Sequence, residues 1–507
     1  MNGSTATDGS HTNGSINGNG VHSTKLNRAE EMDDLLSAVK DLVIPFIKAA
    51  DDAAGQKHTG QTYRTQSGEP HNVLVDYMRP EELAGRMKLS LPVEGRGKEG
   101  LLEVIQKMLK YSVNTWEQGF LDKLFSTNTP IHVYQVAPAL TVVEKTTAKA
   151  LANMYGFTGP NAGGINCQGG SASNLTSLVV ARNTLFPECR TNGNAGHDFV
   201  IFTSQHGHYS VEKAAMILGM GTSSVRAVPV DDEGSLKPEL LAEMVVAAKA
   251  EGKTPLYVNA TAGTTVRGSF EPLEAISAIC KEHGLWMHVD ASFGGPVIFS
   301  RKHSHKMRGS HLADSLTVNP HKMMNVPSTC SYLLGPDMAI FNRANRTAAG
   351  YLFHTGDEDS NEIWDMADLT LQCGRRADSL KLALAWQYYG SAGFERRVDH
   401  AFDMAELLFN AVREASTLHL VSPVLPSCLQ VCFYYAPPGQ AVSDDAATNT
   451  AMTAAIAQDL IPRGFMVDYA PGDKGSFFRV VVNGFTQPDT IHGLIKATEE
   501  IGKEKFA

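Results

Sequence analysis

The feature that most constrains the fold is an alternation of short apolar segments and helical stretches between about residues 150 and 335. The apolar segments are rich in β-branched and aromatic residues, and amphipathic stretches such as PLEAISAICKEHG separate them. Alternation of this kind is typical of right-handed strand–helix–strand units, which build a mostly parallel sheet covered by helices. We therefore predict an α/β fold with five strands in this region: DFVIFTS, SVRAVPV, PLYVNAT, LWMHVDA and SLTVN.

The segments on either side of this region have different patterns. The first 24 residues are rich in Gly, Ser, Asn and Thr, so they cannot bury enough apolar surface to offset chain entropy. The next segment carries a helical apolar stripe, which needs a partner domain or subunit: Leu35, Leu36, Val39, Leu42 and Val43. After about residue 390, a long helix, further strands and more helices indicate a smaller α+β domain. We predict a disordered tail at 1–24, a helical segment at 25–120, a large domain at 121–390 and a small domain at 391–507.

Composition restricts the partners and the location that we expect. The net charge is −10 and no dense Lys/Arg stretch is interleaved with aromatic residues, so we expect no nucleic-acid partner. No run approaches the ~18 apolar residues of a membrane span, and the amino terminus has no signal-peptide pattern. The 7 cysteines are scattered without a CxxC pair, which favours reduced thiols over disulfides or zinc ligands. These features predict a cytoplasmic protein without a membrane anchor or a bound metal.

Polar clusters follow the strands, at the edge of a parallel sheet where ligands bind. The clusters are CQGGSASN (167–174), SQHGHYS (204–210), NATAGTT (259–265), HVDASFGG (288–295) and NPHK (319–322). In the first cluster, Gly170 allows close backbone approach, Ser171 and Ser173 offer hydroxyls, and the following helix supplies N–H groups, which together suit a phosphate. The same residues also make an ordinary helix cap.

Three further residues in these clusters carry side chains with defined chemistry. Asp290 ends an apolar strand, and a carboxylate buried there needs a cationic partner, either a side chain or a protonated ring nitrogen. His208 is either a hydrogen-bonded structural residue or a flat ring that stacks on a cofactor. Lys322 lies either in a surface turn after Asn319 or in the same cleft as Asp290. Together the clusters suit pyridoxal 5′-phosphate, with Lys322 forming the Schiff base and Asp290 keeping the pyridine nitrogen protonated.

Longer stretches add to this pattern: LYVNATAGTTVRGSFEP, LWMHVDASFGG, SRKHSHK, NPHKMM, AGYLF, LQCGRRAD and FFRVVV. In this order they resemble the pyridoxal-phosphate-dependent group II amino-acid decarboxylases, in the branch of glutamate, cysteine sulfinate and aspartate 1-decarboxylases. The resemblance runs from about residue 100 to the carboxyl terminus. It implies a fold type I enzyme (aspartate aminotransferase-like), which is a homodimer with its active site at the subunit interface. It also implies a carboxy-lyase of amino-acid metabolism that converts a small acidic L-amino acid to an amine and CO2.

The resemblance assigns roles to single residues. Lys322 resembles the lysine that binds the cofactor, Asp290 the partner of the pyridine nitrogen, and His208 the ring-stacking histidine. His321 lies beside that lysine, and Arg479 in FFRVVV matches the arginine that holds the substrate carboxylate. The remaining matches lie where the family binds the phosphate or approaches the ring: Ala172, Ser173, Asn319 and Thr261, with Ser292 replacing an alanine under the ring.

A first departure from the family concerns the reaction. In this branch, a loop after AGYLF carries a tyrosine that returns a proton to the substrate carbon, but here HTGDEDSNEIWDMADLT (354–370) contains no tyrosine. His321 or water could replace it, or the reaction could end in oxidative deamination to an aldehyde or in transamination. A catalytically idle binding homologue is a further alternative, against which the presence of Lys322, Asp290, His208 and Arg479 in one chain argues.

A second departure concerns the substrate. The stretch NTWEQGFLDKLFSTNTPIHVYQVAP is shorter than the corresponding part of the relatives. Lys123 lies near the position of a polar residue that recognises the substrate side chain, and His132 replaces an aromatic residue. Both are cationic candidates for binding a distal carboxylate or sulfinate, although Lys123 could also be a solvated helix residue.

Overall fold

A computed structural model of the chain describes residues 15–16, 22–23, 27–54, 74–76, 78–114, 134–194, 196–347 and 363–506. Of the predicted tail at 1–24, the described residues are a short antiparallel pair, β1 (Ser15–Ile16) and β2 (His22–Ser23), and the rest lies outside this description. None of the helices in the described ranges has both the length and the apolar character that crossing a bilayer requires.

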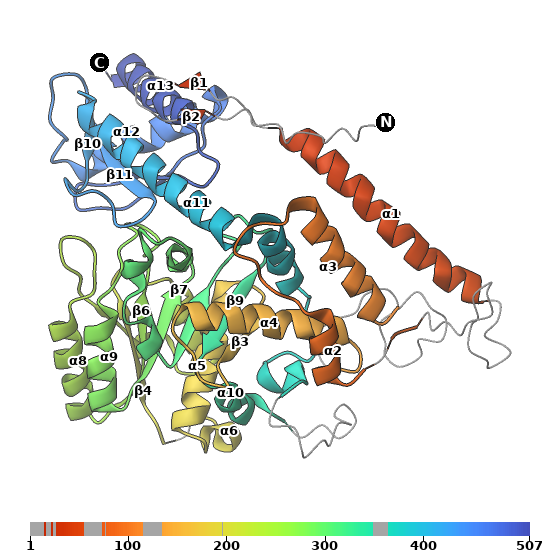
Figure 1. Cartoon of the computed structure of the whole chain (residues 1–507). Helices are drawn as coiled ribbons and strands as arrows, with labels where there is room; N and C mark the ends of the chain where they lie inside the picture. Colours follow the sequence, from red (N-terminus) through yellow and green to blue (C-terminus); the bar gives the residue numbers. More distant parts are fainter. Residues whose placement is uncertain are drawn as a thin grey trace, which may run out of the picture.

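A seven-stranded sheet forms the centre of the molecule, with the strand order β3-β9-β8-β7-β6-β4-β5 (Figure 1). Its strands are β3 (Gly163–Cys167), β4 (Phe199–Ser204), β5 (Val225–Val228), β6 (Thr254–Thr261), β7 (Trp286–Ala291), β8 (Ser315–Val318) and β9 (Ser331–Gly335). Of these strands, β9 alone runs in the direction opposite to the other six. The five predicted strands and the α/β class are confirmed, whereas β3 and β9 were not predicted, because GGINC and SYLLG contain glycine, which is depleted in strands.

Helices cover both faces of this sheet. Along β4, side chains alternate between the faces, so that Val200 and Phe202 join one apolar cluster while Phe199 and Ile201 join another. The first cluster includes residues of α4 (Pro138–Met154), α8 (Pro238–Ala250) and α9 (Leu273–His283). The second includes residues of α5 (Gly170–Leu185), α7 (Ser210–Ile217) and α10 (Met338–Asn345). Both faces of the sheet are therefore covered by apolar side chains and shielded from water. The carboxyl ends of the parallel strands are left for a ligand to bind.

The carboxyl-terminal part packs as a four-stranded antiparallel sheet with helices. Its strands, in the order β10-β11-β13-β12, are β10 (Leu418–Leu420), β11 (Gln430–Tyr435), β12 (Asp468–Ala470) and β13 (Phe477–Val481). Its helices are α12 (Ala446–Leu460) and α13 (Pro488–Phe506), while α11 (Ser379–Glu414) runs from the large sheet into this part (Figure 1). Within α11 the chain kinks at Gly390 (φ 68°), which coincides with the predicted boundary at 390. The division into domains stays a prediction.

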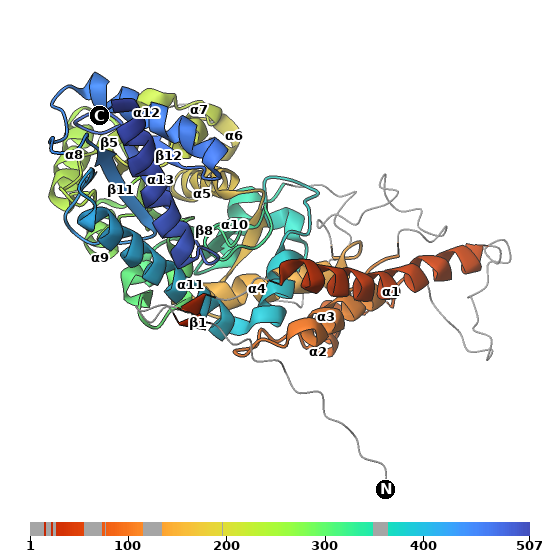
Figure 2. The same cartoon turned by 90° about the horizontal axis from the view of Figure 1, so that it is seen from above.

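The amino-terminal part consists of helices that flank the large sheet. These are α1 (Arg28–Ala54), α2 (Pro80–Met87) and α3 (Gly97–Tyr111). Seen from above, α1 lies beside α3 and extends away from the sheet (Figure 2). An ion pair of 2.6 Å between Lys98 and Asp34 joins the two helices. The outer face of α1 exposes Met32, Leu36 and Ile44 by 58%, 62% and 56%.

A buried ion pair ties α4 to the edge of the large sheet. Arg375 Nη1 lies 3.0 Å from Glu144 Oε1, and the two side chains are 2% and 0% exposed. Glu144 also accepts a hydrogen bond from the backbone N–H of Asn166 in β3 (2.9 Å), and Arg375 donates to the carbonyl of Asn166 (2.5 Å). Because neither side chain reaches water, each charge is stabilised by the other.

Glu144→Gln is expected to lower the free energy of unfolding by about 3–5 kcal/mol, because it leaves the Arg375 guanidinium buried without a counter-charge. Urea denaturation measures this as a lower midpoint. The matched control is Glu251→Gln, which removes the surface pair with Arg226 and should leave the midpoint unchanged. Equal midpoints for the two variants would contradict the prediction.

Candidate active site

A cleft lies at the carboxyl ends of the central strands and encloses about 660 Å³, part of which opens to solvent. It is lined by Gly170, Ser171, Asn174, His208, Tyr209, Thr261, Gly263, Thr265, Asp290, Ser292, Phe293, Asn319, His321 and Lys322. The predicted residues at the ends of five separate strands thus meet in one place. The surface-turn interpretation of NPHK is wrong, because Asn319 is 1% exposed and Lys322 faces this cleft.

Asp290 lies near the end of β7, where its side chain is buried but hydrogen-bonded. Asn174 Nδ2 donates to Asp290 Oδ2 (2.8 Å), and the backbone N–H of Ser292 donates to Oδ1 (3.1 Å). Burial works to raise the pKa of Asp290, but the Ser292 hydrogen bond and the charge of Lys322 outweigh it, so that the pKa lies below its ordinary value. The group is therefore a carboxylate at neutral pH and can accept a hydrogen bond from a protonated ring nitrogen.

A chain of hydrogen bonds behind Asp290 fixes its orientation. Asn174 Oδ1 lies 3.1 Å from His288 Nε2, and His288 Nδ1 lies 2.8 Å from Ser315 Oγ. Because Asn174 uses its Nδ2 group as donor to Asp290, its Oδ1 must accept, and His288 must carry its proton on Nε2. Burial lowers the pKa of His288, which keeps the ring neutral. Trp286 Nε1 donates to the same Ser315 oxygen (2.9 Å) and completes the chain.

Asn174 was not among the predicted site residues, although the sequence carried a signal for it. Asparagine is unfavourable inside helices, and one that occurs there often has a specific side-chain hydrogen bond. Asn174 falls in the first turns of α5, directly after the glycine-rich cluster. His288 carried no comparable signal, because its position inside the apolar segment of β7 is that of an ordinary core residue.

Lys322 is positioned by a tight turn after β8. Its backbone N–H donates to the carbonyl of Asn319 (3.0 Å). Burial lowers the pKa of Lys322, while Asp290 opposes part of this effect, and the net shift is downward. A larger share of neutral amine follows, which is the form that can react with a carbonyl group.

The other end of the cleft is polar and bounded by glycine. Gly169 has φ 100°, a conformation that favours glycine, and a Cβ at Gly170 would lie 2.6 Å from Asn319 Nδ2 and 2.8 Å from Ser292 Oγ. Asn319 Oδ1 and Thr261 Oγ1 are buried without a hydrogen-bond partner. The first N–H groups of α5 also point out of the helix end. Such a cradle fits a phosphorylated, polar cofactor.

Two predicted phosphate ligands do not turn their side chains toward this cradle. The hydroxyl of Ser173 is fully buried against β9, where its Oγ lies 2.7 Å from Ser331 Oγ. Ala172 packs against the apolar cluster below α5. Their backbone N–H groups bond to the carbonyl of Gly169 within the first turn, so neither is directed at the cleft.

Burial lowers the pKa of both histidines of the cleft, which favours their uncharged forms. Burial lowers the pKa of His208, whose Nδ1 accepts the backbone N–H of Ser210 (3.2 Å) and whose ring lies 4.3 Å from that of Tyr209. Burial also lowers the pKa of His321, whose Nδ1 lies 2.6 Å from the carbonyl oxygen of Cys330. His208 thus presents a flat, uncharged ring, whereas His321 is fixed by the backbone.

Arg479 in β13 approaches the cleft from the carboxyl-terminal sheet. Its Nη1 donates to the carbonyl of Thr265 (3.0 Å), a residue of the cleft wall, and its Nη2 pairs with Asp468 Oδ2 (2.6 Å). Lys123 and His132 lie outside the described residues, as does most of the loop 354–370. From that loop, Trp364 is described, and its ring lies 4.2 Å from Lys145 Nζ, against α4.

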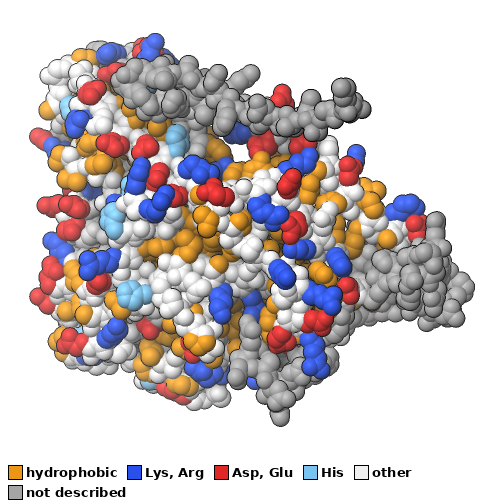
Figure 3. Space-filling model, viewed as in Figure 1, with side chains coloured by type: hydrophobic (Ala, Val, Ile, Leu, Met, Phe, Trp, Pro, Cys, Tyr) orange, Lys and Arg blue, Asp and Glu red, His pale blue; other side chains and the backbone are white. Residues whose placement is uncertain are grey.

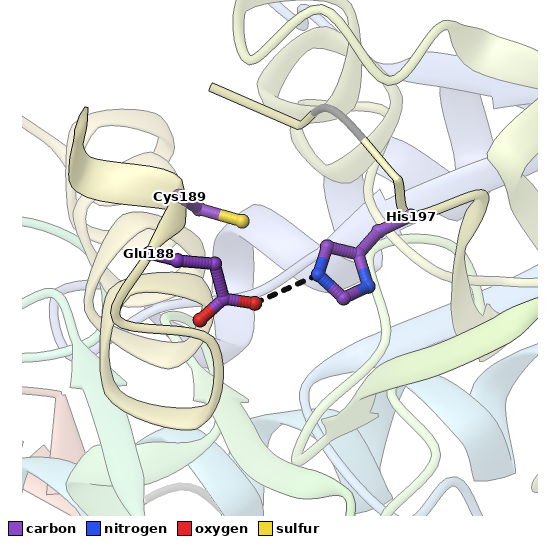
Figure 4. Close-up of side chains that lie close together, drawn as sticks. All are labelled: Glu188, Cys189 and His197. Atoms are coloured by element: carbon purple, nitrogen blue, oxygen red, sulfur yellow. Dashed lines mark hydrogen bonds and ion pairs between the residues drawn. The ribbon is translucent and has the colours of Figure 1, made fainter. Parts of the chain in front are cut away.

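Glu188, Cys189 and His197 form a separate cluster at and near α6 (Cys189–Asn192) (Figure 4). None of these residues lines the cleft. His197 Nε2 lies 2.8 Å from Glu188 Oε1, which gives each of these groups a partner. Burial raises the pKa of the Cys189 thiol, which disfavours the thiolate that metals bind. We assign no ligand to this cluster.

Comparisons with known proteins agree with this geometry. A family model described as the pyridoxal-dependent decarboxylase conserved domain matches residues 80–436. An L-aspartate decarboxylase of Metarhizium robertsii is 55% identical over 495 residues, which span 94% of this chain and 98% of that protein. The cysteine sulfinic acid decarboxylase of Homo sapiens is 36% identical over 455 residues, which span 85% of this chain and 91% of that protein.

The solved structures support the predicted fold type I architecture. The crystal structure of mouse CSAD superposes with a TM-score of 0.70 at 32% identity and covers 94% of this chain and 99% of that one. The fold, the sequence match and the polar cleft that holds Lys322 and Asp290 lead to one conclusion. The chain belongs to the pyridoxal-dependent decarboxylase family, with pyridoxal phosphate as its cofactor.

Proposed function

We propose that the protein decarboxylates a small acidic L-amino acid to the amine and CO2, with L-aspartate as the first candidate substrate. The observation that carries this proposal is the 55% identity, over 94% of the chain, to an L-aspartate decarboxylase. Similarity to a cysteine sulfinic acid decarboxylase supports the acidic substrate class more broadly. The lysine, carboxylate and histidine that line the cleft support the proposal.

When bound, pyridoxal phosphate supplies an electron sink for the negative charge left at the substrate carbon after CO2 departs. We assign its attachment to Lys322, whose lowered pKa favours the neutral amine. Asp290, a carboxylate at neutral pH, would hold a proton on the ring nitrogen. The uncharged ring of His208 would stack on the cofactor, and Gly170, Ser171 and Asn319 would surround the phosphate.

Substrate recognition is assigned to cationic residues. Arg479 would hold the substrate carboxylate, because its guanidinium reaches the cleft wall at Thr265. Lys123 and His132 remain predictions for the distal acidic group. The proton that returns to the substrate carbon is assigned to water or His321, and Trp364, whose ring packs on Lys145, is not a candidate.

We further propose a homodimer. The exposed Met32, Leu36 and Ile44 give α1 an apolar face that a second copy of the chain would bury. Figure 3 shows apolar side chains among the charged ones on the face of the molecule that carries α1. Sedimentation velocity of the purified protein tests this, since a boundary of monomer mass alone would contradict it.

A cytoplasmic location is proposed from the cysteines. All seven are free, and six of them are buried or half-buried in the packed structure. Proteins with many unpaired thiols are typical of reducing compartments.

Purified protein is expected to convert L-aspartate to β-alanine and CO2, whereas Lys322→Ala should lose the absorbance band of the attached cofactor and reduce turnover by a factor on the order of 10³ or more. Chromatography of amine, aldehyde and ammonia measures the products. Lys253→Ala, which removes an exposed partner of Asp198, is the matched control. Aldehyde and ammonia in place of the amine would contradict the proposed reaction.

Asn174→Ala is expected to lower kcat roughly 10- to 100-fold, the worth of a hydrogen bond to a charged group. The Asn174 N–H lowers the pKa of Asp290, so its loss raises that pKa, and the acid limb of the pH–rate profile should move to higher pH. Asn183→Ala, at the other end of α5, is the control. A reduced rate without a shifted acid limb would show that Asn174 acts on packing alone.

A further inference from the structure

The arginine that we assign to the substrate already holds a carboxylate of this chain. Arg479 Nη2 lies 2.6 Å from Asp468 Oδ2, and the two residues are direct cross-strand partners in the register of β12 and β13. This pairing is built into the sheet, because both side chains leave the same face at the same level.

The two members of the pair have different environments. The Arg479 side chain is 19% exposed, whereas that of Asp468 is 66% exposed. β12 is the edge strand of the small sheet, so none of the described strands pairs with it on the outer side, beyond Asp468. The acid can therefore turn into solvent, while the guanidinium stays at the cleft wall through its hydrogen bond to the carbonyl of Thr265 (3.0 Å).

The arrangement limits how a second carboxylate can bind. A guanidinium binds a carboxylate best through two N–H groups at once. On Arg479, one N–H of Nη2 donates to Asp468 and one N–H of Nη1 donates to Thr265, while Nε is buried without a partner. A substrate carboxylate that binds Nη2 therefore competes with the Asp468 carboxylate for this nitrogen and for the positive charge of the guanidinium.

We propose that Asp468 is an internal competitor for the substrate carboxylate, occupying Arg479 in the free enzyme and leaving it when substrate binds. The inference rests on the proposed role of Arg479. Because partly exposed ion pairs are weak, the competition costs at most about fivefold in affinity. Asp468 is thus a residue that sets the affinity for the substrate carboxylate at Arg479 without contacting the reacting atoms.

A different role for the same contact predicts the opposite change in substrate affinity. If Asp468 serves to orient Arg479 for the substrate, removing its charge weakens substrate binding. If it competes, removing its charge strengthens binding. The direction of the change therefore separates the two roles.

The test uses the cofactor-loaded enzyme with Asp468→Asn, which keeps the size of the side chain. KM and kcat for L-aspartate are measured together with the dissociation constant of succinate, an unreactive dicarboxylate, by calorimetry. Asp444→Asn is the matched control, because Asp444 pairs with Lys474 (3.1 Å) on the surface of the same part of the chain. Arg479→Gln tests the residue on which the inference rests.

We expect KM and the succinate dissociation constant to fall about three- to fivefold in Asp468→Asn, with kcat and the Asp444→Asn variant unchanged. Constants that stay the same or rise in Asp468→Asn, while Arg479→Gln weakens both, would overturn the competitor role alone. If Arg479→Gln also leaves both constants unchanged, the assignment of Arg479 fails and the inference fails with it. The succinate measurement needs no turnover, so it decides even if L-aspartate is not the substrate.

Discussion

The organisation of the cleft depends on one buried charge, the carboxylate of Asp290. Burying an isolated carboxylate at the end of β7 would carry a large desolvation free energy. The groups around Asp290 offset this cost and keep the side chain ionised. Asn174 and the backbone of Ser292 donate to its two oxygens, and Lys322 contributes an opposite charge. The same groups define where a positively charged ring must lie.

Two parts of the chain meet around this charge. The large sheet contributes Asp290 and Lys322 from adjacent parallel strands, since β7 pairs with β8 directly. The carboxyl-terminal sheet contributes Arg479, which reaches the cleft wall at the carbonyl of Thr265. A continuous apolar cluster joins the two sheets through α11, so the position of Arg479 relative to the cleft is fixed by packing.

The sequence allowed the strands and the cleft to be predicted, because both depend on local pattern. Short apolar segments located β4 to β8, and polar residues at their ends located Lys322, Asp290 and His208. The bonds between Asn174, His288 and Asp290 join residues far apart in the chain, and no local pattern encodes them. The side-chain direction of Ser173 could not be predicted from the sequence either, because it depends on contact with Ser331 in β9. The ion pair of Arg479 with Asp468 required the register of β12 and β13.

We assign the attachment of the cofactor to Lys322, which lines the same cleft as Asp290. Reduction of the cofactor-loaded protein with borohydride converts a carbon–nitrogen double bond into a stable amine, and peptide mass spectrometry then locates the modified residue. We predict a pyridoxyl group on Lys322, in the peptide that contains NPHK. A pyridoxyl group on any other lysine, with none on Lys322, would contradict it.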